Sequence, residues 1–187
     1  MPSTTLRTFI AVKVPATRPL RPVLAEFETM GRAVRAVAAD SLHVTLKFLG
    51  DTRQDAVAEI EETLRAVVAE TAAFDVRLVG LGAFPHAGRP SAVWAGIQDA
   101  EPLTEIAAEL ERALEPLGFA AEQRAFQPHL TLARVKSKPP PALGELLSAH
   151  AATEFGGVAI RSVEFFRSDL RPDGPVYTPL ASVSLSR

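Results

Sequence analysis

The chain has 187 residues and a formal net charge of −2 at pH 7, with 47% apolar and 22% charged residues. This composition is that of a globular domain and excludes a disordered or fibrous chain, and the slight negative charge argues against coating long stretches of nucleic acid. The chain has no cysteine, which excludes disulfides and thiolate chemistry, and it lacks a membrane-spanning apolar run and a signal peptide. We therefore expect a soluble cytoplasmic protein with no membrane partner.

The first half of the chain predicts alternating strands and helices. Period-two and helix-period apolar patterns assign each segment. The expected elements are a strand at 7–15, a helix at 20–37, a strand at 41–50, a helix at 57–68 and a strand at 74–84. Asp51 and Thr52 are candidate caps for the second helix.

The second half repeats this order. Pro102 near the first turn and Gly118 at the end bracket the first helix of this half. The expected elements are a strand at 91–99, a helix at 102–117, a strand at 127–135, a short helix at 143–150, and two closing strands at 156–170 and 176–186.

The matching order of the two halves indicates an internal duplication. We expect an α+β fold in which residues 1–187 form one domain of two pseudo-symmetric lobes. Antiparallel sheets would face a central cleft, with the helices on the outside. The equivalent strands near 41–49 and 127–135 would then lie across the cleft from each other.

These two strands carry the same polar motif. "HVTL" begins at His43 and "HLTL" begins at His129, so that Thr45 and Thr131 each follow a histidine by two residues. Because side chains alternate along a strand, each histidine shares a face with its threonine. Strict alternation adds Lys47 to the face of His43 and places Val44, Leu46 and Phe48 on the opposite face. One lone motif would suggest a structural role, but two at equivalent positions indicate a shared site.

Two histidines and two threonines suit displacement at phosphorus. A neutral imidazole can accept a proton while a protonated one donates a proton. Threonine hydroxyls can donate hydrogen bonds to phosphate oxygens. A metal site needs three or more ligands, and neither motif is accompanied by a carboxylate or a further histidine, so we expect no metal and no cofactor. The residues alone leave open which histidine donates and which accepts.

The paired motifs resemble those of the two-histidine (2H) phosphoesterase superfamily. The segments "LHVTLKFLGD", "LGAFP", "GFAAEQRAFQPHLTLAR" and "GPVYTPLA" are similar to the bacterial RNA 2′,3′-cyclic phosphodiesterases, historically called 2′-5′ RNA ligases. The likeness covers nearly the whole chain in order. It implies metal-independent hydrolysis of the 2′,3′-cyclic phosphate at RNA 3′ ends to a 2′-phosphomonoester.

The resemblance also implies residue roles. His43 would be the proton donor to the departing 3′ oxygen, and His129 the proton acceptor that activates water. Thr45 and Thr131 would hold the non-bridging phosphate oxygens. In reverse, the same groups would join a 5′-hydroxyl to a cyclic phosphate as a 2′-5′ bond.

Positive residues near the motifs are further candidates. Arg134 could hold phosphate, but strict alternation points it away from His129, so a twist or bulge would be required. Lys47, Lys136 and Lys138 could add a local positive field for an anion, or could be solvated strand ends.

The aromatic residues are expected mainly to pack. Phe9 and Phe48 could stack on a base, although core packing is the favoured interpretation of both. Trp94 and Tyr177 are expected to pack within strands.

The two other histidines are weak candidates. His86 is expected to be an exposed loop residue, and His150 is expected to face solvent at a helix end.

Two other functions remain open. The protein could bind nucleotides or RNA ends without turning them over, although a binder does not need two matched proton-transfer groups. It could instead act on a small cyclic nucleotide or on a cyclic phosphate from tRNA processing. A monomer is the default expectation.

Overall fold

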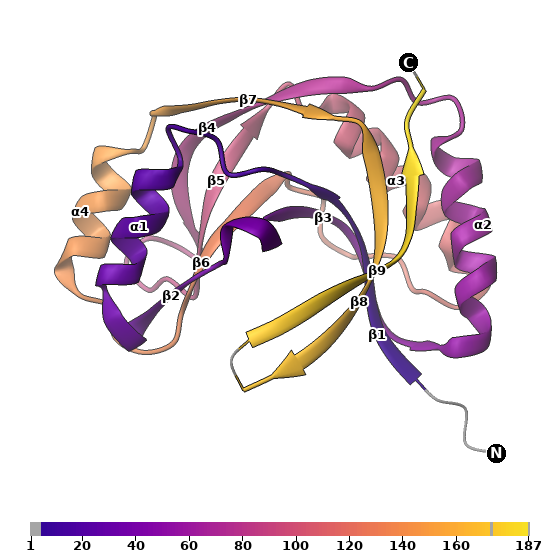
Figure 1. Ribbon diagram of the computed structural model, residues 1–187, viewed down its shortest axis with the longest axis horizontal. Coiled ribbons are helices and arrows are strands. Elements are labelled where there is room, and N and C mark those ends of the chain that lie inside the picture. Colours follow the sequence, from indigo (N-terminus) through magenta and orange to yellow (C-terminus); the bar gives the residue numbers. More distant parts are fainter. Residues whose placement is uncertain (1–4, 173, 187) are drawn as a thin grey trace.

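Two antiparallel sheets organise the protein, whose computed structural model describes residues 5–172 and 174–186 (Figure 1). The first sheet has the strand order β3-β1-β8-β9 and the second has the order β2-β6-β5-β4-β7. The strands are β1 (Thr5–Lys13), β2 (Val34–Ala36), β3 (His43–Arg53), β4 (Phe74–Phe84), β5 (Ala92–Gln98), β6 (His129–Val135), β7 (Glu154–Ile160), β8 (Ser162–Arg171) and β9 (Gly174–Ser184). The helices are α1 (Arg21–Thr29), α2 (Val57–Val68), α3 (Glu101–Leu114) and α4 (Pro141–Ala149). The predicted α+β class is confirmed.

The helices flank the sheets as two pairs. Helices α2 and α3 pack together against β9 and β3 of the first sheet, while α1 contacts β2 and α4 contacts β4 of the second sheet (Figure 1). One continuous apolar core joins the helices and both sheets; among its large, completely buried side chains are Phe27, Leu64, Leu110, Phe155 and Phe165. None of the described helices is long and apolar enough to cross a membrane.

Each sheet takes strands from both halves of the chain. Strand β4 follows α2 but pairs with β5 and β7 in the second sheet. Strands β8 and β9 close the chain but lie in the first sheet, where β8 pairs with β1. The sheets therefore do not divide the chain at one point, and the duplication of its halves stays a prediction.

The helix predicted at 20–37 is too long. Helix α1 ends at Thr29, and Gly31 follows in the left-handed region at φ 66°. The amide of Val37 then donates to the carbonyl oxygen of Leu132, so this segment runs along β6 as an extended chain. The apolar residues at 34 and 37 continue the helical spacing, but Val34 is buried as part of strand β2 and not of a helix.

The caps predicted for the second helix are also wrong. Strand β3 continues through Asp51 and Thr52 to Arg53, and the helix begins only at Val57. The hydroxyl of Thr52 is buried and lies 2.7 Å from that of Thr8, on the neighbouring strand. The Thr52 hydroxyl therefore forms a hydrogen bond between two strands and does not cap the helix.

The end of the chain forms three strands in the structure, where the sequence predicted two. Arg161 separates β7 from β8, and the two strands enter different sheets. A continuous apolar pattern across residues 156–170 gives no sign of this change of sheet.

A buried ion pair ties strand β3 to helix α3. Lys47 Nζ lies 2.6 Å from Glu111 Oε2, and the lysine side chain is only 1% exposed. Lys47 also donates to the carbonyl oxygen of Ala120, and the amide of Glu122 donates to the same Glu111 oxygen. The first motif strand is thereby fixed to the segment that leads to the second motif.

We expect Glu111→Ala to lower the free energy of unfolding by about 3 kcal/mol, because it leaves the lysine charge buried without a counter-ion. Lys47→Met should cost less, since Glu111 is partly exposed and keeps the Glu122 amide. Urea denaturation of each variant measures both values.

Glu109→Ala is the matched control, because Glu109 lies on the same helix in an exposed pair with Arg112. Its effect should stay below about 1 kcal/mol. Equal losses for Glu109→Ala and Glu111→Ala would show that the buried pair has no special weight.

Candidate active site

The two motif strands share one burial pattern. Over the six residues from each histidine, positions one and three are half-buried, positions two, four and five are buried, and position six is exposed. Position six is Phe48 in β3 and Arg134 in β6. The same local structure is therefore built twice.

A β-bulge in each strand causes this pattern. In β3, Thr45 pairs with Ala11 and Lys47 with Ile10, so Leu46 has no partner on β1. In β6, Thr131 pairs with Trp94 and Ala133 with Val93, so Leu132 has no partner on β5. An extra residue interrupts the alternation of side chains, and two successive residues then face the core.

The bulges decide which residues accompany the histidines. We call the exposed side formed by His43, Thr45 and Phe48 of β3 and by His129, Thr131 and Arg134 of β6 the motif face.

Two expectations based on strict alternation are wrong. Lys47 turns into the protein to meet Glu111, and Phe48 is 59% exposed instead of packed in the core. The bulge required to bring Arg134 to the motif face is present.

Each histidine is held by the backbone of the segment that directly precedes its strand. His43 Nδ1 lies 2.8 Å from the carbonyl oxygen of Ser41, and His129 Nδ1 lies 2.7 Å from that of Gln127. A carbonyl oxygen only accepts, so Nδ1 carries the proton in both rings. Nε2 is then the nitrogen left for proton transfer.

Aromatic rings pack against both imidazoles. The Phe9 and Tyr177 ring centroids each lie 5.0 Å from that of His43, and Phe84 lies 4.9 Å from His129. Phe9 is 3% exposed, which confirms the expected packing role. The rings restrict imidazole rotation and remove water from one side of each histidine.

The motif face is electrostatically coupled. Burial lowers the pKa of His43 below its ordinary value of 6.5, and electrostatic repulsion from Arg134, and from His129 when that ring is protonated, lowers it further. The Ser41 carbonyl opposes this shift. Residues from the two sheets are thus close enough to act on one another, and His43 of the free protein favours its neutral form.

Tyr177 was not anticipated at this site. Its ring contacts His43 from strand β9. Burial raises the pKa of Tyr177 above its ordinary value, and the charges of Arg134 and Arg7 oppose this shift. A lone tyrosine in a strand carries no sign of such a contact, because β9 and β3 lie at opposite edges of the first sheet.

Trp94 lies on strand β5, directly beside the second motif strand. It pairs with Thr131 on one side and with Gly82 on the other. A Cβ at Gly82 would lie 2.3 Å from the indole, so only glycine leaves room for this ring. The expected packing role of Trp94 is confirmed.

The other histidines lie apart from the motif face. His86 is exposed in its loop, as expected. His150 is half-buried against Phe155, and its Nδ1 lies 3.1 Å from the Thr153 hydroxyl, so its predicted solvent exposure is wrong. Neither residue is among the contacts of the motif histidines.

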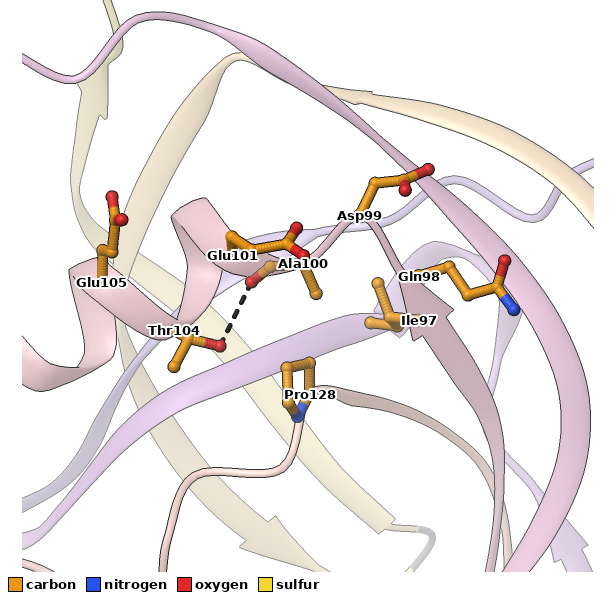
Figure 2. Close-up of a pocket in the computed structure, with 8 residues that line it drawn as sticks. All are labelled: Ile97, Gln98, Asp99, Ala100, Glu101, Thr104, Glu105 and Pro128. Atoms are coloured by element: carbon orange, nitrogen blue, oxygen red, sulfur yellow. Dashed lines mark hydrogen bonds between the residues drawn. The ribbon is translucent and has the colours of Figure 1, made fainter.

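A hollow of about 700 Å³ lies beside the second motif (Figure 2). Pro128, at its rim, directly precedes His129, but Asp99, Glu101 and Glu105 also line it. Carboxylates repel phosphate, so this hollow does not suit the expected substrate. The motif face carries the exposed, positively charged side chain of Arg134 instead.

Comparison with known proteins gives a consistent result. A family model described as the 2′-5′ RNA ligase superfamily matches residues 18–171. An RNA 2′,3′-cyclic phosphodiesterase of Archaeoglobus fulgidus is 34% identical over 177 residues, covering 94% of this chain and 98% of the relative. One of Aeropyrum pernix is 39% identical over 155 residues, covering 82% and 87%. The crystal structure of TT0787 of Thermus thermophilus matches with a TM-score of 0.80 and 30% identity, covering 96% of this chain and 98% of that one.

We expect the imidazole of His43 to titrate with a midpoint below 6.5 in the free protein, and Arg134→Met to raise that midpoint. The midpoint should rise because removing a positive neighbour lowers the free-energy cost of protonating the His43 ring. The chemical shift of the His43 ring proton, followed against pH by NMR, measures both values.

Arg32→Met is the control, since it removes an exposed arginine from the turn before β2 and should leave the midpoint in place. A midpoint that stays or falls in Arg134→Met would contradict the coupling.

Proposed function

The chain belongs to the 2′-5′ RNA ligase superfamily, and we propose that it hydrolyses the 2′,3′-cyclic phosphate at RNA 3′ ends to a 2′-phosphomonoester. The expected family is confirmed by these matches. One observation carries the activity: two histidines on equivalent bulged strands, each with Nδ1 held by the carbonyl two residues earlier. Two imidazoles oriented alike suit one proton acceptor and one proton donor.

His129 is proposed to accept the proton of water. Its Nδ1–H is held by the Gln127 carbonyl, so the neutral ring presents the Nε2 lone pair. As the water oxygen bonds to phosphorus, its proton passes to Nε2, and the bond from phosphorus to the 3′ oxygen breaks. The electron pair of that bond leaves with the 3′ oxygen.

His43 is proposed to donate the proton that the 3′ oxygen takes. It must then enter the reaction with both ring nitrogens protonated, although its surroundings in the free protein favour the neutral ring. A bound phosphate anion raises the pKa of an adjacent imidazole, so substrate binding itself supplies the required form.

Thr45, Thr131 and Arg134 are proposed to bind the phosphate. Each threonine lies two residues beyond a histidine on the same side of its strand, within the motif face. Hydroxyl donors and a guanidinium stabilise the charge that builds on the non-bridging oxygens. These groups need no metal ion, and hydrolysis is proposed to be metal-independent.

The partners follow from this chemistry. We place the protein in the cytoplasm, acting as a monomer on RNA ends with a 2′,3′-cyclic phosphate. With a 5′-hydroxyl in place of water, His129 would accept the hydroxyl proton and His43 would again donate a proton to the departing 3′ oxygen, which forms a 2′-5′ bond. Only the reverse step, cleavage of that bond by the 3′-hydroxyl, would exchange the two roles.

We expect the purified, EDTA-treated protein to convert a short RNA ending in a 2′,3′-cyclic phosphate to the 2′-phosphate product, identified by its phosphate position. Turnover that depends on an added divalent ion would overturn the metal-free proposal. Absence of turnover both with and without added metal would favour a protein that binds RNA ends without hydrolysing them.

His43→Ala and His129→Ala should each remove most of this turnover while leaving thermal stability near that of the wild type. His86→Ala is the matched control, because that exposed loop histidine lies outside the motif face.

We expect a substrate with sulfur in place of the 3′ oxygen to restore turnover in His43→Ala and not in His129→Ala. A thiolate leaves without a proton at neutral pH, since thiols are far more acidic than alcohols. Single-turnover rates of both variants on both substrates test the roles. Rescue of His129→Ala instead would reverse them.

A further inference from the structure

A second arginine lies next to Arg134. Strand β2 pairs antiparallel with β6, and Arg35 stands directly opposite Arg134 in this pairing. Directly opposed residues share a face of the sheet, so Arg35 belongs to the same side as the motif face. Both side chains are exposed, and β2 is an edge strand.

The arginines that the structure describes either pair with a carboxylate or, like Arg35, Arg134 and Arg32, do not. Within residues 5–172 and 174–186, neither Arg35 nor Arg134 forms an ion pair with a carboxylate. Several other arginines do form one: Arg53, Arg65, Arg77, Arg112 and Arg167. Like charges that oppose each other across two strands are destabilising, and an anion between them would remove the repulsion.

Arg35 also lies where the two sheets meet. Its Nη2 would be 3.1 Å from a Cβ at Gly174, the first residue of β9 in the other sheet. Tyr177 stands three residues further along β9 and touches His43. The start of β9 therefore lies beside the edge strand β2, and the same strand β9 carries the tyrosine that contacts His43.

We propose that Arg35 binds the phosphodiester that joins the terminal nucleotide to the nucleotide before it. The inference rests on the proposed function, in which Arg134 holds the terminal phosphate beside the histidines. One strand further out, Arg35 meets the next negative charge as the RNA leaves over the edge of the second sheet. A mononucleotide has no such phosphate, so Arg35 makes the protein selective for RNA ends.

This contact gives selectivity for chain length without selectivity for base. A guanidinium bound to a phosphodiester reads backbone charge alone, so the preference should hold for any penultimate base. It should also produce a salt dependence, because each phosphate contact displaces counterions from the RNA.

We expect Arg35→Met to reduce kcat/KM on a dinucleotide ending in a 2′,3′-cyclic phosphate by about tenfold to a hundredfold, the range for a charged hydrogen bond. Turnover of a mononucleoside 2′,3′-cyclic phosphate should stay within about twofold, because histidines, threonines and Arg134 remain. The salt slope of log kcat/KM on the dinucleotide should become shallower by about 0.7. Arg32→Met should change none of these values.

A modified substrate tests the contact without altering the protein. Replacing the internucleotide phosphate of the dinucleotide by an uncharged methylphosphonate should cost the wild type the same factor and should cost Arg35→Met nothing further. This comparison holds even if the variant is less stable, because the wild-type loss alone reveals whether the charge is recognised.

The outcomes separate the two proposals. Three results would overturn this inference and leave the proposed function intact. In the first, Arg35→Met loses kcat/KM equally on both substrates; in the second, it loses none on either. In the third, the methylphosphonate has no effect on hydrolysis by the wild type. Absence of hydrolysis of either substrate by the wild type would remove both.

Discussion

The paired β-bulges are the constraint on which the site depends. One extra residue in each motif strand, Leu46 or Leu132, sends two successive side chains into the core and returns the next one to the surface. Without the bulge, Arg134 would point away from His129, and Lys47 would stand on the motif face instead of pairing with Glu111. The bulge in β6 thus sets the position of a surface cation, and the bulge in β3 sets that of a buried ion pair.

The two equivalent strands do not build equivalent surroundings. At the sixth motif position β3 presents the apolar ring of Phe48, while β6 presents the charge of Arg134. Opposite the threonines, β1 supplies Ala11 and β5 supplies Trp94. The guanidinium of Arg134 therefore lies on the second sheet, whereas the first sheet has the apolar ring of Phe48 at the equivalent position, which distinguishes two histidines with the same backbone hydrogen bond.

Sequence reasoning captures what local pattern determines. The strand at 74–84 has the predicted bounds, and the repeated motif is enough to single out the two histidines among the four of the chain. The errors concern features that depend on contacts between elements distant in sequence. They are the strand pairing that inserts a bulge, the ion pair that turns Lys47 inward, and the placing of β7 and β8 in different sheets. Tyr177 and Arg35 join the site only through sheet pairing, and no spacing along the chain records such a neighbour.

The exchange of strands between the sheets has a consequence for folding. The first sheet lacks two strands until the end of the chain is present, and the second needs β4 from the first half to bridge β5 and β7. Neither half can therefore complete a sheet alone, and contacts between residues far apart in sequence must form together, which slows folding. During synthesis β3 can pair with β1 early, but the other side of β1 stays without its partner β8 until nearly the whole chain has left the ribosome. The two motif strands, although built alike, thus belong to one cooperative unit and not to two independent modules.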